Sequence, residues 1–165
     1  MTQDFTLRDA TASDTAAILR LIRALADYER LSHTVTATEA ELHAALFGRK
    51  PRADCILADV AERSVGLALF YYTFSTFKAR PIIFLEDLFV EPAHRGAGIG
   101  LALMRHLARR AVAEGCQSVE WRVLNWNQPS IAFYQSLGAK QIEDWQTRQL
   151  SGGALAALAK GSSHG

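Results

Sequence analysis

The chain has 165 residues, enough for one domain with a hydrophobic core. Hydrophobic residues make up 49% and charged residues 21%, the balance of an ordinary soluble globular protein. The 18 Lys and Arg against 17 Asp and Glu give a formal charge of +1, so nothing electrostatic points to nucleic acid or a membrane as partner. No apolar run is long enough to span a bilayer, and residues 1–10 lack a signal-peptide core. We expect a cytoplasmic protein.

Hydrophobic periodicity and turn residues predict an alternation of strands and helices. In chain order these are a strand at 5–8, helices at 14–28 and from a capping box at 36–41 to Phe47, strands at 55–60, 65–74 and 81–90, a helix from Ile99 to Gly115, a strand at 118–123, a helix at 129–137 and a strand at 144–150. This order predicts a single α/β domain at 1–150, a mixed sheet sandwiched by helices.

Residues 151–165 are rich in Gly, Ala and Ser and read as a flexible tail. We expect one helical turn at Leu155 and Leu158, and disorder in the last five residues. The two cysteines, Cys55 and Cys116, each begin a predicted strand and are expected to be buried and reduced. No Cys-x-x-Cys or His-x-x-x-His spacing occurs, so we expect no metal.

The most informative segment runs from Leu88 to Gly100. Strand formers end at Glu91-Pro92, Arg95 and glycines at 96, 98 and 100 follow, and an amphipathic segment begins at Ile99. Such an order builds an anion site, because glycines let the backbone approach a ligand and the first amides of a helix have no partners. The spacing matches neither a Walker loop nor a dinucleotide fingerprint. A glycine-rich turn without a ligand is the plain alternative.

Two adjacent carboxylates, Glu86 and Asp87, interrupt an otherwise apolar strand. Burying charge is costly unless it is paired or neutralised. Side chains alternate along a strand, so the two should point to opposite faces, but a bulge would relax that rule and aim both toward one cleft. The alternative is that one of them is a structural acid paired with an arginine.

A second constellation lies at 125–134. Asn127 precedes Pro129 near a helix start, where it can cap the helix or bind a ligand amide. Ser130 and Tyr134 are four residues apart and share a helix face, and a tyrosine there can donate a proton to a leaving group. Taken alone, Tyr134 reads equally as a core residue with a satisfied hydroxyl. The basic face at Arg105, Arg109 and Arg110 has no assigned role beyond a solvated helix surface.

The run Arg-Gly-Ala-Gly-Ile-Gly at 95–100 resembles the acetyl-CoA loop of the GNAT N-acetyltransferases. Asn127, Ser130 and Tyr134, followed by Gly138, resemble the second signature of that superfamily. Segments 18–29, 84–90 and 126–134 are similar to the diamine acetyltransferase subgroup, which includes spermidine/spermine and thialysine acetyltransferases. The resemblance spans roughly residues 4–148.

The resemblance implies direct transfer of an acetyl group from acetyl-CoA to a small primary amine by a homodimer. Tyr134 would protonate the departing thiolate, and Glu86 would help to deprotonate the amine. The residues expected to contact acetyl-CoA are Leu88, Phe89, Val90, Arg95, Gly96, Ala97, Gly98, Ile99, Gly100, Leu101, Asn127, Ser130 and Tyr134. Those expected to line an acidic cleft for the amine are Tyr28, Glu29, Glu86, Asp87, Glu120 and Trp121.

The expected substrate is a diamine, a polyamine or a thialysine-like amino acid. Polyamine-specific members carry a tryptophan in the loop before the Glu-Asp strand, whereas here the loop at 74–80 offers Phe77, and Lys78 and Arg80 would repel a polycation that they faced. Transfer to a protein lysine or N-terminus is the alternative enzyme reading. A non-catalytic acetyl-CoA sensor is the alternative from another class, and the presence of Tyr134 with Glu86 argues against it.

Overall fold

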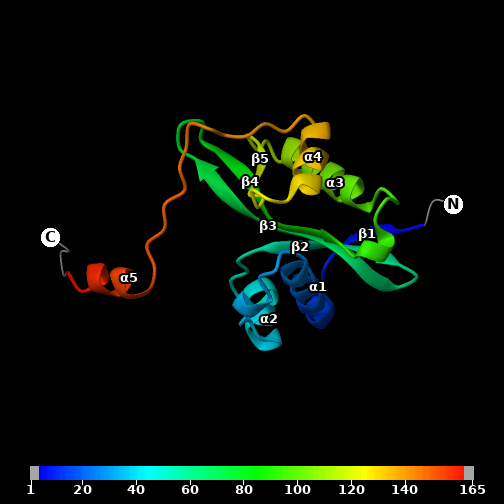
Figure 1. Cartoon of the computed structure of the whole chain (residues 1–165), viewed down its shortest axis with the longest axis horizontal. Coiled ribbons are helices and arrows are strands. Elements are labelled where there is room, and N and C mark those ends of the chain that lie inside the picture. The colour runs from blue at the N-terminus through cyan, green and yellow to red at the C-terminus, as the bar shows by residue number, and fades with distance from the viewer. Residues whose placement is uncertain (1–3, 162–165) are drawn as a thin grey trace. The chain divides into compact units, whose positions relative to one another are not determined.

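The structure, a computed structural model, describes residues 4–161 and confirms the α/β fold (Figure 1). Its sheet has the strand order β1-β2-β3-β4-β5, antiparallel throughout except that β5 runs parallel to β4. The strands are β1 (Thr6–Asp9), β2 (Asp54–Val60), β3 (Arg63–Ser75), β4 (Arg80–Val90) and β5 (Val119–Trp121). The helices are α1 (Thr15–Tyr28), α2 (Glu39–Phe47), α3 (Ile99–Ala113), α4 (Gln128–Ser136) and α5 (Gly152–Ala159).

The described chain divides after Arg122 into two compact units. The first holds the sheet, with α1 and α2 on one face and α3 on the other (Figure 1). The second holds α4 and α5 and the segment between them. The mixed sheet with helices on both faces is therefore as the element order predicts.

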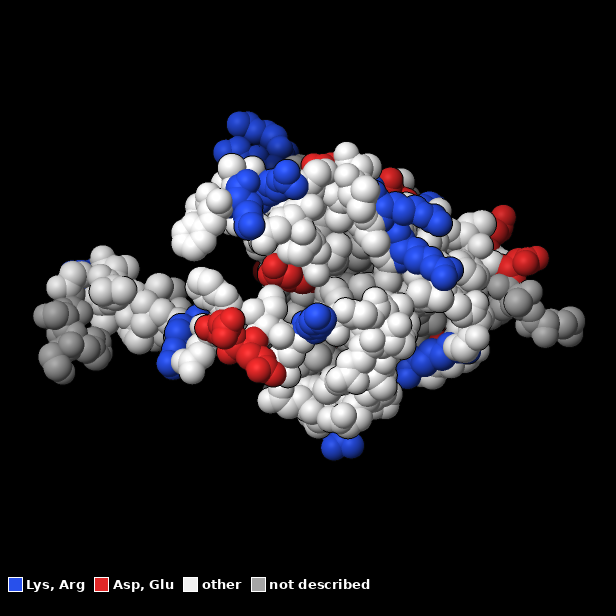
Figure 2. Space-filling model, turned by 90° about the horizontal axis from the view of Figure 1, so that it is seen from above, with Lys and Arg blue, Asp and Glu red and all other residues white. Residues whose placement is uncertain are grey.

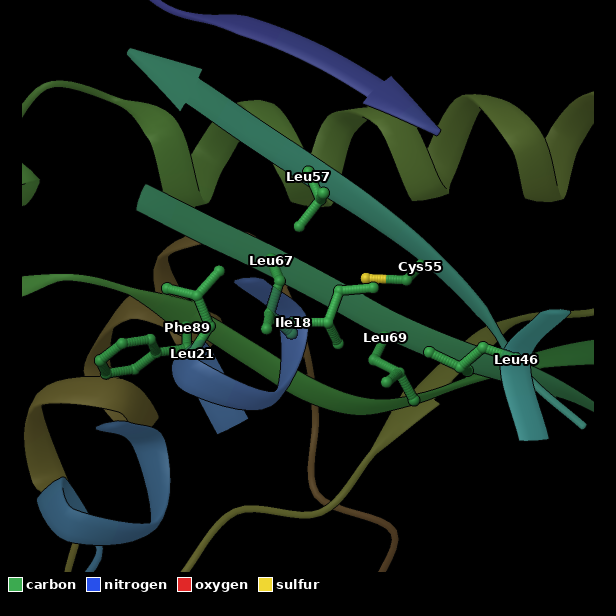
Figure 3. Packing of buried hydrophobic residues seen from close by; sticks show 8 residues of the cluster. All are labelled: Ile18, Leu21, Leu46, Cys55, Leu57, Leu67, Leu69 and Phe89. Carbon is green, nitrogen blue, oxygen red and sulfur yellow. The ribbon is translucent and has the colours of Figure 1, made fainter. Parts of the chain in front are cut away.

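An apolar cluster packs between the sheet and the helices on its α1 face (Figure 3). It is made of Ile18, Leu21, Leu46, Cys55, Leu57, Leu67, Leu69 and Phe89. Because side chains alternate along a strand, the strand residues next to those of the cluster face α3. On that face the Arg110 guanidinium lies 5.2 Å from the ring centre of Phe70. Neither cysteine forms a disulfide; Cys55 is buried as expected, and burial raises the pKa of its thiol to about 12, whereas Cys116 is only half-buried.

Ion pairs tie α1 to the end of β4. Arg20 pairs with Glu91, and its Nη2 also donates to the carbonyl of Ser64 at 2.6 Å. Arg63 holds the same Glu91 carboxylate through contacts of 2.5 and 2.8 Å. These arginines hold the pKa of Glu91 below its usual value. The network fixes the point at which the chain leaves β4 and enters the glycine loop.

The expected strand at 144–150 is wrong: these residues adopt neither strand nor helix, and all are exposed. A strand needs a neighbour to satisfy its backbone groups, and none of the described ladders reaches this segment. In the tail the structure has more regular structure than expected. The single turn expected at Leu155 and Leu158 is part of the longer helix α5, because Ala and Leu are strong helix formers. The expected disorder concerns residues 161–165, of which 162–165 lie outside the described residues.

Candidate active site

A β-bulge in β4 sets the geometry of the site. The register of the β3–β4 ladder pairs Leu69 with Asp87 and Phe70 with Leu85, which leaves Glu86 as an extra residue. Asp87 therefore lies on the face of Leu69, which is the α1 face. The bulge considered from the sequence is present at the two adjacent acids.

Glu86 lies on the same face. Tyr71 follows Leu69 by two residues on β3, and its hydroxyl donates to Glu86 Oε2 at 3.3 Å. The Tyr71 ring packs against Phe84, the residue two before Glu86, with ring centres 5.2 Å apart. Both carboxylates thus point to the α1 side of the sheet, which strict alternation would forbid.

Glu29, Glu86 and Asp87 form what we call the acidic cluster. Burial raises the pKa of Asp87 to about 6, and the charges of Glu86 and Glu29 act in the same direction. Burial also raises the pKa of Glu29, the residue directly after α1. A largely buried Asp87 that is repelled by two neighbouring carboxyl groups favours a bound cation, which would relieve the repulsion.

The edge of β4 opens at the bulge. The parallel β4–β5 ladder pairs Ile83 with Val119 and ends at Leu85 with Trp121, so in the described chain residues 86–90 have no β5 partner. Their backbone groups on that side are available to a ligand. At the far end, Arg95 Nε donates to the carbonyl of Val90 at 2.9 Å.

The glycine loop follows directly. Gly96 and Gly98 have φ of 79° and 84°, and a Cβ at either would meet no atom within 4 Å, so the backbone conformation and not lack of space requires glycine. Gly98 caps α3, and the first helical bond runs from the Ala102 amide to the Gly98 carbonyl at 2.9 Å. The amides of Ile99, Gly100 and Leu101 are left to bind an anion, which fits a pyrophosphate.

Arg95 joins the loop to the end of α1. Its guanidinium lies 4.8 Å from the ring centre of Tyr28 and 5.7 Å from that of Phe89. Tyr28 packs against the apolar cluster and precedes Glu29. The expected anion loop and the acidic cluster therefore approach one another through Tyr28 and Arg95.

Glu120 and Trp121 divide between the faces of the sheet. Glu120 stands in register with Phe84, on the α1 face, and the Ser118 hydroxyl donates to its carboxylate at 2.9 Å. Trp121 stands beside Leu85, whose register partner Phe70 belongs to the α3 face. The register thus brings Glu120 to the side of the acidic cluster.

In the second unit, Asn127 is the cap that the sequence predicts. It is buried, and its side-chain oxygen accepts from the Ser130 amide at 3.3 Å at the start of α4. Pro129 lies in the first turn, where a missing N–H costs nothing. Ser130 and Tyr134 are both half-buried, and the Tyr134 ring lies 5.3 Å from that of Phe133.

Sequence reasoning missed Arg122 and Tyr71. Arg122 Nη2 lies 3.4 Å from Glu86 Oε2, and the guanidinium stacks 5.3 Å from the ring centre of Phe84. Alternation could have placed Tyr71 on the face of Leu69 and Arg122 on the face of Glu120. Their contact with Glu86, however, depends on the bulge and on the β4–β5 register.

The comparisons with known proteins agree with this geometry. Residues 18–139 match the model of the acetyltransferase (GNAT) family. The chain is 37% identical to the thialysine N-epsilon-acetyltransferase of Bos taurus, over 93% of this chain and 96% of that protein. It is 34% identical to the spermidine/spermine N(1)-acetyltransferase-like protein 1 of Homo sapiens, over 86% of this chain but 22% of that protein.

Among solved structures, an integron cassette protein from the mobile metagenome of V. cholerae superposes with a TM-score of 0.80 at 27% identity, covering 97% of this chain and 99% of that one. The chain belongs to the acetyltransferase (GNAT) family. It is an acetyl-CoA-dependent N-acetyltransferase, and its sequence relatives include thialysine and polyamine-type acetyltransferases.

Two features are absent from residues 4–161. No helix there is both long and apolar enough to cross a membrane. No group of three or more His, Cys, Asp or Glu side chains there is arranged to hold a metal ion. The face of the molecule drawn in Figure 2 carries both acidic and basic side chains, in separate groups.

Proposed function

We propose that the protein transfers the acetyl group of acetyl-CoA to a small primary amine, a diamine, polyamine or thialysine-like amino acid. The observation that carries this proposal is the β4 bulge, which puts Glu86 and Asp87 on one face. Together with Glu29 they offer a concentrated negative charge to an ammonium group. The names of the similar thialysine and spermidine/spermine proteins support the same substrate range.

The chemistry follows from the charge of the amine. A free alkyl amine has a pKa of about 10.4, so it arrives as an ammonium ion and cannot attack. The acidic cluster binds the cation, and Glu86 accepts a proton from it, directly or through water. The pKa of Asp87, about 6, leaves that side chain ionised at neutral pH once a cation approaches. The neutral amine then attacks the thioester directly.

Binding of acetyl-CoA is assigned to the open edge of β4 and the glycine loop. Backbone groups of Leu88, Phe89 and Val90 hold the pantetheine arm and stabilise the developing oxyanion. The amides from Gly96 to Leu101, with Arg95, receive the pyrophosphate. Asn127 and Ser130 add contacts from α4, and Tyr134 donates a proton to the departing thiolate.

The test is CoA release from acetyl-CoA across a panel of putrescine, spermidine, spermine, thialysine, lysine and a lysine peptide. Tyr134→Phe and Glu86→Gln should each lower kcat by about a hundredfold or more, because each removes a proton-transfer group. Tyr72→Phe and Glu62→Gln are the matched controls, since Tyr72 bonds Glu114 near α3 and Glu62 lies in an exposed turn. Both controls should keep full activity.

Three outcomes would count against the proposal. Unchanged turnover in Tyr134→Phe and Glu86→Gln would remove the catalytic assignment. Turnover of the lysine peptide alone would favour a protein lysine or N-terminal acetyltransferase. Tight acetyl-CoA binding without turnover of any amine would favour a sensor.

We also infer that the protein works as a homodimer in the cytoplasm. The homodimer rests on likeness to the diamine acetyltransferases. The cytoplasmic location rests on the balanced composition of the chain. Sedimentation of the purified chain gives its mass, and fractionation of cells that express it gives its location.

A further inference from the structure

The guanidinium of Arg122 contacts the acidic cluster at Glu86. Its side chain is 63% exposed and approaches Glu86 through Nη2 alone, at 3.4 Å, a long contact for an ion pair. The planar guanidinium rests on the Phe84 ring, 5.3 Å from its centre. It is therefore held beside the acids by stacking, with most of its hydrogen-bond donors turned to solvent.

The ion pair between Arg122 and Glu86 would be broken by a cationic substrate. An ammonium group at Glu86 competes with Arg122 for the same carboxylate and repels the guanidinium. If the substrate also carries a carboxylate, Arg122 regains an anionic partner. If the substrate carries only amines, the guanidinium is left beside a second positive charge. The site thus presents a positive group next to negative ones, which complements a dipolar molecule.

We propose that Arg122 is a specificity-determining residue that binds the α-carboxylate of the substrate. The preferred substrate is then an α-amino acid with a terminal primary amine, and diamines or polyamines are poorer. This inference rests on the proposed function, because it needs the terminal amine to bind at Glu29, Glu86 and Asp87. Guanidinium and carboxylate make a bidentate pair, which fixes the orientation of the amino acid as well as its charge.

The test compares molecules that differ only in the carboxylate. Lysine is paired with cadaverine, and ornithine with putrescine, and kcat/KM is measured for each pair. The unaltered enzyme should prefer the amino acid. Arg122→Gln should lower kcat/KM for the amino acid by about tenfold through KM, and should leave or raise that for the diamine. Arg122→Lys should retain part of the preference, because it keeps the charge but not the fork.

Arg105→Gln is the matched control, because it removes the same charge from an exposed position on α3, beyond the opposite face of the sheet. For each pair, the ratio of kcat/KM for the amino acid to kcat/KM for the diamine should equal that of the unaltered enzyme. Thermal unfolding of Arg122→Gln checks that the fold persists.

The results separate this inference from the proposed function. If the enzyme acetylates these amines but Arg122→Gln leaves the ratio of kcat/KM for amino acid and diamine unchanged, this inference is overturned and the proposed function stands. An equal loss on both members of each pair means that Arg122 only positions Glu86, which also overturns it. If the unaltered enzyme acetylates none of these four amines and none of the amines in the panel above, the proposed function itself is overturned.

Discussion

The fold disfavours the ionised form of Asp87. Its side chain is largely withdrawn from water, and its close charged neighbours Glu86 and Glu29 have the same sign. Its pKa of about 6 in the folded protein lies above the ordinary value of 3.8. The folded state therefore binds the proton more tightly than the unfolded state, and stability falls as the pH rises from about 4 to about 6. At neutral pH the cost is fully present.

Asp87→Asn should accordingly make the protein more stable and less active. We expect the free energy of unfolding at pH 7 to rise by about 1–3 kcal/mol, with the gain appearing between pH 4 and 6 and absent below. Urea unfolding at a series of pH values measures it, with Glu62→Gln as the control for loss of one exposed charge. A gain that persists at pH 3 would mean that relief of the carboxylate is not the cause.

The acidic cluster also shows what a single residue cannot reveal from sequence. Two acids in an apolar strand indicated a site, and alternation alone gave them opposite faces. Only the register of the β3–β4 ladder, with Leu69 opposite Asp87 and Phe70 opposite Leu85, shows that the two carboxylates lie on the same face of the sheet. Arg122 was beyond prediction for a related reason, because its partner Glu86 lies 36 residues away and meets it only across the β4–β5 ladder.

At the scale of elements, the sequence predicted those helices and turns whose formation depends on residues close together in the chain. Helix α1, the capping box of α2, the hairpin of β2 and β3 and the glycine entry to α3 all follow from periodicity, caps and turns. The strand expected at 144–150 failed because a strand exists only beside a partner, and partners are not written in a local pattern. The helix α5 is longer than the single turn expected, because Ala and Leu are strong helix formers.

The glycine loop offers a test at this scale. Gly98 has φ of 84° and open space around it, so Gly98→Ala should strain the backbone without a clash. We expect a loss of about 1 kcal/mol in the free energy of unfolding and a several-fold rise in KM for acetyl-CoA, because the amides at the start of α3 shift. Gly153→Ala, at a glycine without a positive φ, is the control.

Kinetics with varied acetyl-CoA at saturating amine, together with thermal unfolding, measure both effects. If Gly98→Ala loses stability but keeps its KM for acetyl-CoA, the loop does not hold the pyrophosphate and the assignment of the anion site falls. If neither quantity changes, the left-handed backbone at Gly98 is not required.

At the scale of the whole molecule, the sheet and the tail differ in how they are held. The first unit has a dense apolar core and ion pairs that join α1 to β4. The tail helix α5 has eight residues and exposes Leu155 and Leu158 by 52% and 62%. An isolated helix of this length is marginal in water. We therefore propose that the acetyltransferase domain ends near Leu150 and that residues 151–165 add little to its stability.

A chain that ends at Leu150 tests this boundary. We expect its thermal midpoint to stay within about 2 °C of that of the full chain, because no buried side chain is lost beyond Leu150 in the described residues. Its sedimentation should still give a dimer, and its kcat should be unchanged. A truncated chain that sediments as a monomer, with a lower midpoint, would instead mean that the exposed leucines of α5 pack on a second copy. The functional unit would then include the tail, and the boundary at Leu150 would be wrong.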